Sequence, residues 1–196
     1  ADPCSSSAEF SDGSFSVSYL LSCMSKLALI TGASSGIGFE LAKAMAEEGF
    51  DILLVARSHA KMVEIGRGIE NQYGVKTHVV AIDLAQPHSG EALFEATRKY
   101  QDQLEYVCNN AGFGEVIQFK DQNLSTLNEM LQLNILSLTE LTRLFGQLFT
   151  TRRSGSILNV ASVAAFQPGP YMSAYYASKS YVLSLSHATR YEFAEF

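Results

Sequence analysis

The sequence predicts a doubly wound α/β domain, in which helices cover both faces of a parallel sheet. The first observation is that short, continuously apolar runs alternate with longer amphipathic stretches from Lys26 onward. Such runs are typical of strands that are buried on both faces. The second is a glycine-rich turn directly between the first apolar run and the first amphipathic stretch. The third is the composition, because 47% hydrophobic and 17% charged residues indicate a globular domain.

Five apolar runs predict the strands of this sheet. Each run is short, and stretches of helical periodicity lie between them, so right-handed crossovers are expected. In such folds ligands bind at the carboxyl ends of the strands, near the point where the strand order reverses. The predicted strands are residues 27–31, 51–56, 77–82, 106–108 and 156–160.

Helical periodicity predicts five helices. Their apolar residues recur every three or four positions, although Gly66 and Gly68 weaken the second helix because glycine disfavours helical structure. The first helix carries Ile37, Leu41 and Met45, and the second carries Met62, Ile65, Ile69 and Tyr73. The others are expected at residues 91–100, at about 125–149, and from 175 to the end of the chain.

Charge and cysteine content exclude several classes of protein. The net charge of −6 argues against nucleic acid or an anionic membrane surface as a partner. No run approaches the roughly 18 apolar residues that span a bilayer, so no membrane span is expected. The three cysteines, Cys4, Cys23 and Cys108, are too few and too scattered for a disulfide framework or a zinc site, and no metal is expected. Cys108 lies in an apolar run typical of a core residue in a reducing compartment, which favours a cytoplasmic protein.

Residues 1–25 differ from the rest of the chain. They are rich in serine, carry Asp2, Glu9 and Asp12, and contain no Lys or Arg. A secretory signal would have a basic start and a longer apolar core, whereas a transit peptide would be rich in arginine. We interpret residues 1–25 as a disordered leader or an artificial extension, with Met24 as the native start. Residues 26–196 then form one domain.

The glycine-rich turn, Thr31–Gly38, predicts a dinucleotide-binding site. Its glycines allow a tight turn and a close approach of the backbone to a phosphate, and the following helix N-terminus supplies unpaired N–H groups. Many strand–helix turns need glycine, so its place between a strand and a helix is the confirming context. The spacing is not that of a P-loop, which argues against hydrolysis of nucleoside triphosphates.

The end of the second predicted strand favours NADP(H) over NAD(H). An NAD site places an acidic residue there, to accept a hydrogen bond from the ribose 2′-hydroxyl. This strand instead ends in Ala56, Arg57 and Ser58. A guanidinium pairs well with a 2′-phosphate, and Asp51 lies at the wrong end of the strand to replace the missing acid.

A tyrosine and a lysine four residues apart form a candidate catalytic pair. Tyr175 and Lys179 lie on one face of a helix, and a nearby ammonium favours the phenolate form of a tyrosine. A tyrosine tuned in this way can act as a general acid or base. Taken alone, the stretch is also typical of an ordinary helix, and Tyr176 lies within equal reach of Lys179.

Four motifs in register resemble the classical short-chain dehydrogenase/reductase (SDR) family. They are Thr31–Gly38, Asn109–Gly112, Ser162, and Tyr175 with Lys179, and Ser162 precedes Tyr175 by 13 residues. The resemblance runs from about Lys26 to the end of the chain. It implies a Rossmann-type three-layer α/β/α sandwich that transfers a hydride between a nicotinamide cofactor and a carbonyl or alcohol.

The resemblance also implies the cofactor-binding residues. They are Gly32, Ser34, Ser35, Gly36, Ile37 and Gly38 around the pyrophosphate, Asp83 and Leu84 at the adenine, Asn110, Ala111 and Gly112 along the cofactor, and Tyr175 and Lys179 at the nicotinamide ribose. Arg57 joins them through the 2′-phosphate argument.

Four residues carry the implied chemistry. Hydride transfer to a carbonyl carbon develops negative charge on the oxygen, which must be held and protonated. Tyr175 would donate the proton and Ser162 would hydrogen-bond the same oxygen. Lys179 would hold the ribose hydroxyls, and Asn134 would hold a water in the proton relay. The family pattern Tyr-x-Ala-Ser-Lys assigns Tyr175, rather than Tyr176, as the acid.

The expected substrate is small and hydrophobic. Phe113 follows the Asn-Asn-Ala-Gly segment, and the segment Val163–Ser173, with Phe166, Pro168 and Tyr171, lies between the catalytic serine and tyrosine. Phe113 and this segment, Phe166 above all, would line a mainly apolar pocket with Ser162 and Tyr175, although ordinary loop packing would explain them equally well.

The chain ends at Phe196, before the last strands and the substrate-closing segment that the family carries. We therefore expect a C-terminally truncated sheet with an uncovered edge, and doubtful activity for this 196-residue chain. Family resemblance predicts a homodimer or homotetramer through the long helix and the Tyr175 helix.

Two alternatives stay open at this point. One is a catalytically impaired cofactor-binding or regulatory fragment, which the intact serine, tyrosine and lysine disfavour. The other is a sugar-nucleotide epimerase of the related extended type, which shares Tyr-x-x-x-Lys but has a different glycine spacing.

Overall fold

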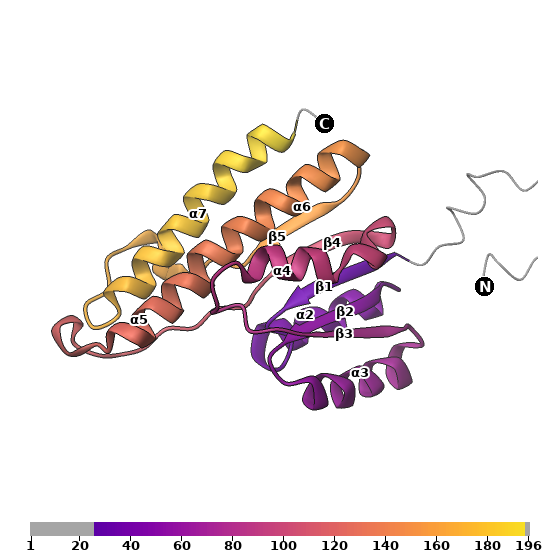
Figure 1. Ribbon diagram of the computed structural model, residues 1–196, viewed down its shortest axis with the longest axis horizontal. Helices are drawn as coiled ribbons and strands as arrows, with labels where there is room; N and C mark the ends of the chain where they lie inside the picture. Colours follow the sequence, from indigo (N-terminus) through magenta and orange to yellow (C-terminus); the bar gives the residue numbers. More distant parts are fainter. Residues whose placement is uncertain (1–25, 195–196) are drawn as a thin grey trace, which may run out of the picture.

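A five-stranded parallel sheet forms the centre of the computed structural model, which describes residues 26–194 (Figure 1). The predicted leader lies outside the described residues. The strand order is β3-β2-β1-β4-β5, and all neighbouring pairs are parallel. Leu29 of β1, for example, pairs with Leu53 of β2 and Val107 of β4. The strands are β1 (Leu27–Thr31), β2 (Asp51–Ala56), β3 (Thr77–Ala81), β4 (Leu104–Asn109) and β5 (Ser156–Asn159).

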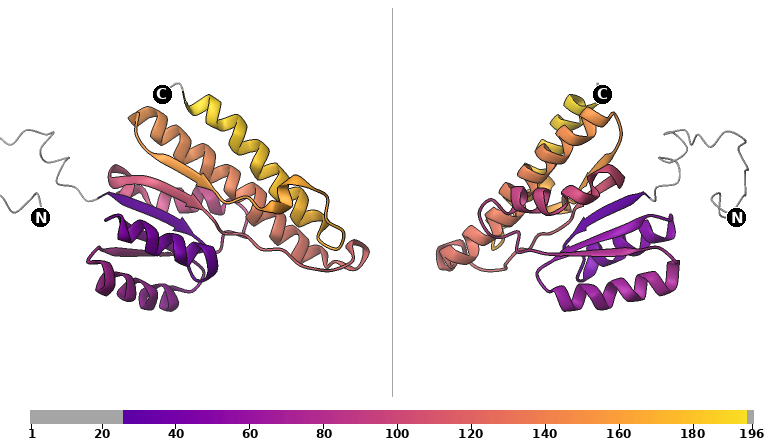
Figure 2. Two further views of the ribbon diagram at one scale, coloured as in Figure 1. Left: turned by 180° about the vertical axis from the view of Figure 1, so that it is seen from behind. Right: turned by 45° about the vertical axis from the view of Figure 1, so that its right-hand side comes forward.

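Helices cover both faces of this sheet, which confirms the predicted doubly wound α/β fold (Figure 2). The chain winds from β1 out to β3 with α2 and α3 on one face, and then crosses to β4 and β5 with α4 and α6 on the other. Helix α7 runs beside α6 (Figure 1). The helices are α2 (Gly36–Glu47), α3 (His59–Tyr73), α4 (Ser89–Ala96), α5 (Leu124–Leu131), α6 (Leu138–Arg152) and α7 (Ser173–Phe193).

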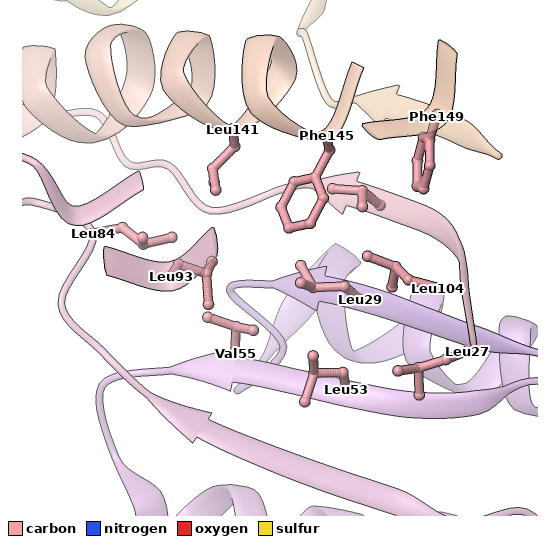
Figure 3. Packing of buried hydrophobic residues seen from close by; sticks show 11 residues of the cluster. Leu27, Leu29, Leu53, Val55, Leu84, Leu93, Leu104, Leu141, Phe145 and Phe149 are labelled. Carbon is pink, nitrogen blue, oxygen red and sulfur yellow. The ribbon is translucent and has the colours of Figure 1, made fainter. Parts of the chain in front are cut away.

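Alternate side chains of each central strand enter two different apolar cores. Leu27 and Leu29 of β1 pack with Phe145 under α4 and α6 (Figure 3), whereas Ala28 and Ile30 pack under α2 and α3. Side chains alternate between the faces of a strand, so a strand covered on both sides must be apolar at every position. All five residues of β1 are buried. The continuous apolar runs of the sequence thus follow directly from the three-layer arrangement.

The third helix is shorter than the periodicity predicts. It ends at Ala96 and is followed by a 3₁₀ segment, Arg98–Gln103, so that β4 begins at Leu104. Thr97 follows the last helical residue, and its hydroxyl donates to the backbone oxygen of Phe94, which favours the tighter geometry. Contacts with Arg152 of α6, which donates to the Leu104 carbonyl, then hold the start of β4. These contacts are distant in sequence.

The long helix predicted at about 125–149 has three parts. It begins as α5, passes through a π-helical segment, Gln132–Ser137, and continues as α6. Asn123 caps its start, because its side-chain oxygen accepts hydrogen bonds from the N–H groups of Ser125 and Thr126. A π-helical turn is rare and often marks a functional site. The apolar periodicity alone does not indicate it.

Replacing Phe145 by alanine is expected to lower the free energy of unfolding by about 3–5 kcal/mol, because it leaves a cavity in a close-packed core. Phe145 is fully buried and packs edge-on against Phe94. Urea denaturation followed by far-ultraviolet circular dichroism measures the change. Phe119→Ala is the matched control, since Phe119 is mostly exposed and should change the same quantity by less than about 0.5 kcal/mol. Equal losses for both variants would contradict the assigned core.

Candidate active site

A cleft of about 1120 Å³ opens at the carboxyl ends of the strands. It lies where the strand order reverses, between β1 and β4, which is where doubly wound folds bind ligands. Its walls come from the glycine-rich turn, the end of β2, the segments after β3, β4 and β5, and the start of α7. Most of the residues singled out in the sequence therefore meet in one place.

Glycines shape the turn between β1 and α2. Gly32 has a φ of 69° and Gly36 a φ of 57°, a left-handed region that favours glycine. A Cβ on Gly38 would clash with the backbone oxygen of Gly32 and the amide of Asn110. Gly32, Ser34, Ser35, Gly36 and Ile37 line the cleft, and Gly38 lies behind them. The turn and the start of α2 thus form a bare backbone cradle of the kind that holds a pyrophosphate.

Thr31 and Asn110 join this turn to the end of β4. The Thr31 hydroxyl accepts hydrogen bonds from the N–H groups of Asn110 and Ala111, both at 3.0 Å, and donates to the Cys108 carbonyl. The Asn110 amide donates in return to the Thr31 carbonyl at 2.9 Å. Asn110, Ala111 and Gly112 line the cleft as expected. Thr31 begins the predicted glycine-rich turn, but no role for its hydroxyl was predicted from the sequence.

The end of β2 supplies positive charge to the cleft. Arg57 is exposed and lines the cleft, together with Ser58 and Lys61. The Ser58 hydroxyl accepts a hydrogen bond from the Lys61 N–H and so caps α3. Sequence reasoning missed Ser58 and Lys61, although Lys61 lies one helical turn after Arg57. Asp83 and Leu84, which follow the neighbouring strand β3, also line the cleft.

The amide of Asn134 is a buried junction behind the cleft. Asn134 lies in the π-helical segment and is 1% exposed. Its oxygen accepts from the Phe113 N–H at 3.1 Å, and its nitrogen donates to the Phe113 carbonyl at 2.9 Å and to the Ser178 hydroxyl at 3.1 Å. Ser178 in turn donates to the Tyr175 carbonyl. One side chain therefore connects the π segment, the segment after β4 and α7.

Tyr175 and Lys179 enter the cleft from α7. The Lys179 ammonium lies 5.9 Å from the centre of the Tyr175 ring and donates to the Val160 carbonyl at 2.8 Å. Lys179 is 5% exposed, and burial lowers its pKa because a charged ammonium loses its hydration. Tyr176 does not line the cleft and packs instead over Gly169. The two tyrosines are equivalent by spacing, and only Tyr175 reaches the cleft.

Ser162 lies after β5, close to the start of α7. Its backbone is extended, and its hydroxyl accepts a hydrogen bond from the Ala164 N–H at 3.1 Å, which caps the 3₁₀ turn Val163–Phe166. Ser162 lines the same cleft as Tyr175 and Lys179. The hydroxyl hydrogen of Ser162 is not used by this cap, so it can be donated to a ligand.

One predicted substrate contact lies elsewhere. Phe113 lines the cleft, but Phe166 does not: its side chain is 76% exposed, in a separate hollow with Pro168 and Tyr176. The short 3₁₀ turn after Ser162 reverses the chain and carries Phe166 away from the cleft. Other apolar side chains that line the cleft include Val163 and Met172, which belong to the segment predicted to line the pocket, and Leu133, for which no such role was predicted.

The family model described as short chain dehydrogenase matches residues 26–196. This chain belongs to that family. The SDR resemblance of the four motifs is therefore confirmed, and the family is one of oxidoreductases.

Individual relatives are similar over most of this chain. Very-long-chain 3-oxoacyl-CoA reductase of Anas platyrhynchos is 32% identical over 173 residues, which are 85% of this SDR and 54% of the relative. The bulky-bulky ketone specific alcohol dehydrogenase of Comamonas testosteroni superposes with a TM-score of 0.82 at 31% identity, over 88% of this chain and 69% of that one.

A short-chain dehydrogenase of Sphingobium yanoikuyae, solved in complex with NADPH, gives a TM-score of 0.82 at 32% identity. The match covers 87% of this chain and 66% of that one. This SDR spans about half the length of the curated relatives that it matches.

Two further properties bear on partners. Within residues 26–194, no helix is both long and apolar enough to cross a membrane. No group of three or more His, Cys, Asp or Glu side chains that could hold a metal ion occurs in the described part of the chain.

Replacing Asn134 by alanine should lower the free energy of unfolding by roughly 2–4 kcal/mol, because two partly buried backbone groups of Phe113 lose their partners. Urea denaturation measures this loss. Asn128→Ala is the matched control on the same helix, since Asn128 is exposed and lies outside the cleft. A loss at Asn134 no larger than the loss at Asn128 would show that the amide junction adds little stability.

Proposed function

We propose that this SDR is an NADP(H)-dependent oxidoreductase that transfers a hydride between the cofactor and a carbonyl or alcohol group of a hydrophobic substrate. The observation that carries the proposal is the meeting of Ser162, Tyr175 and Lys179 in the cleft that also contains the glycine cradle. An ordinary helix face would not direct a tyrosine and a buried lysine into a cleft beside such a cradle. The geometry thus combines a cofactor site with an acid in reach of it.

The residues present fit a dinucleotide. The left-handed Gly32 and Gly36 and the bare backbone at Gly38 leave space for a pyrophosphate at the N-terminus of α2. The cleft continues to Arg57 at one end and to Tyr175 at the other. When bound, the nicotinamide supplies the hydride chemistry, and the protein holds and orients the reactants.

Tyr175 is the proposed proton donor to the substrate oxygen. Ser162 would donate its hydroxyl hydrogen to the same oxygen, which stabilises the negative charge that develops there. Lys179 has three N–H donors and uses one on the Val160 carbonyl. The other two remain to hold the nicotinamide ribose hydroxyls and to favour the deprotonated form of the acid after proton transfer.

Asn134 is proposed to act through its backbone. Both hydrogens of its side-chain amide are donated, to Phe113 and to Ser178. A water in the proton relay would therefore be held by the backbone carbonyl of Asn134. In the π-helical segment the backbone hydrogen bonds do not follow the regular α-helical pattern, so a backbone carbonyl there can accept a hydrogen bond from another partner.

The proposed substrate is a hydrophobic ketone or a 3-oxoacyl thioester. Phe113, Leu133, Val163 and Met172 give the cleft an apolar wall, and Glu129 of α5 is the acidic side chain that lines the cleft beside them. Two similar proteins support this class, since one is named for 3-oxoacyl-CoA reduction and the other for bulky ketones. A homodimer or homotetramer and a cytoplasmic location stay predictions of the sequence.

Tyr175→Phe is expected to abolish turnover apart from a small residual rate, because phenylalanine has no proton to donate, and to leave the affinity for NADPH within about twofold. Oxidation of NADPH, followed at 340 nm with propiophenone, androstenedione and acetoacetyl-CoA, measures turnover. The chain of 196 residues is assayed beside any longer native form. Tyr176→Phe is the matched control and should retain activity. Loss of activity in the Tyr176 variant alone would reverse the assignment.

Arg57→Ala should weaken NADPH binding by roughly 10- to 100-fold, the value of a few charge-assisted hydrogen bonds. NADH carries no 2′-phosphate, so its affinity should change little. The fluorescence of bound NADPH, excited at 340 nm, can be titrated directly. Arg67→Ala, on the outer part of α3 and outside the cleft, is the control. Equal affinity of the wild-type protein for both cofactors would contradict the proposed specificity.

A further inference from the structure

Gly114 lies directly against the ring of the proposed catalytic tyrosine. A Cβ at this position would be 2.7 Å from Cδ2 and 2.8 Å from Cγ of Tyr175, distances that real side chains essentially never show. It would also be 3.1 Å from the Met172 methyl group. We propose that Gly114 is a positioning residue, whose missing side chain lets the segment after β4 set the orientation of the Tyr175 ring. The inference rests on the proposed role of Tyr175.

The backbone conformation does not explain a glycine here. Five glycines of the described chain have a positive φ, namely Gly32, Gly36, Gly49, Gly74 and Gly155, and Gly114 is not among them. The φ of Gly114 therefore lies outside the left-handed region that disfavours an alanine. Space against Tyr175 is therefore what excludes a side chain.

The segment around Gly114 is held on both sides. Immediately before it, the N–H and the carbonyl of Phe113 are both bonded to the Asn134 amide. Three residues after it, the Ile117 N–H donates to the Tyr171 carbonyl at 2.8 Å, just before α7. Because the backbone is fixed at both ends, an added methyl group would have to displace the ring rather than the loop.

The contact is with Cγ and Cδ2 of Tyr175, at the end of the ring opposite the hydroxyl, so the displacement that it causes is largest at the phenolic oxygen. Cγ joins the ring to the rest of the side chain, and a small turn there moves the phenolic oxygen farther than the point of contact. Misplacement of a reacting group by about 1 Å can cost on the order of 100-fold in rate. The cofactor would not be affected to the same degree, because the glycine cradle and Arg57 lie at the other end of the cleft.

The test is Gly114→Ala, with Gly68→Ala as the matched control. Gly68 lies in α3, and nothing lies within 4 Å of a Cβ built there. Gly114 is exposed and belongs to neither apolar core, so the variant is expected to fold. The substrate is whichever of propiophenone, androstenedione and acetoacetyl-CoA the wild-type protein reduces fastest with NADPH. We expect the kcat for this substrate to fall about 10- to 100-fold in Gly114→Ala. The Kd for NADPH should stay within about twofold, and Gly68→Ala should match the wild-type protein.

A double variant separates positioning from a general structural effect. If Gly114 acts through the Tyr175 hydroxyl, adding Gly114→Ala to Tyr175→Phe should lower the residual rate no further. An additional loss in the double variant would overturn the proposal. So would a Gly114→Ala variant that unfolds or no longer binds NADPH, because Gly114 would then serve the fold rather than the acid.

A readout without turnover keeps this proposal distinct from the proposed function. In protein labelled with 3-fluorotyrosine, the ¹⁹F resonance that Tyr175→Phe removes reports on the Tyr175 ring. Gly114→Ala should shift this resonance and Gly68→Ala should not. An unchanged resonance with unchanged kcat would overturn the role of Gly114. A wild-type protein that reduced no ketone would instead count against the proposed function, and the resonance would still decide the Gly114–Tyr175 contact.

Discussion

The hydrogen bonds between Thr31 and the segment after β4 are the interaction on which the rest of the site depends. Strands β1 and β4 are neighbours at the point where the strand order reverses. The chain leaves these two strands toward opposite faces of the sheet, so a crevice opens between their carboxyl ends. The Thr31 hydroxyl bonds to two N–H groups and one carbonyl of the β4 end, and the Asn110 amide returns a hydrogen bond to β1. These hydrogen bonds hold the glycine cradle and the Asn-Asn-Ala-Gly segment next to each other. Tyr175 and Lys179 of α7 line the same cleft.

The second level of organisation is a chain of buried polar contacts that leads from this segment to α7. Asn134 bonds to the backbone of Phe113 and to Ser178, and Ser178 bonds to the carbonyl of Tyr175. Each of these groups is satisfied, so the network orders the site without the cost of an unpaired buried group. On the opposite side of the cleft, the Val160 carbonyl holds the Lys179 ammonium. The helix that carries the proposed acid is thus held by the side chain of Asn134 and by the backbone carbonyl of Val160.

Large parts of this arrangement follow from the sequence, and others do not. The alternation of apolar runs and amphipathic stretches predicts the parallel sheet, because a strand buried on both faces must be apolar throughout. The four motifs predict the family. The π-helical turn at Asn134 has no signal in the apolar periodicity, and Phe166 lies outside the cleft because a short turn after Ser162 reverses the chain. Ser58 and Lys61 line the cleft because α3 begins close to the end of β2. The sequence does not show in which direction this helix leaves the strand.

What the sequence by itself determined are the features that depend on local chemistry: the apolar character of the central strands, the glycines of the turn after β1, and a tyrosine four residues before a lysine. Only the tertiary structure decided which side chains meet. Tyr175 and Tyr176 are equally close to Lys179 along the helix, yet one enters the cleft and the other packs on Gly169. The glycine at position 114 has no positive φ, and the reason for a glycine there is found only in its contact with the Tyr175 ring. The physical cause is the same in both cases, because the direction of a side chain is set by packing against segments that are remote in sequence.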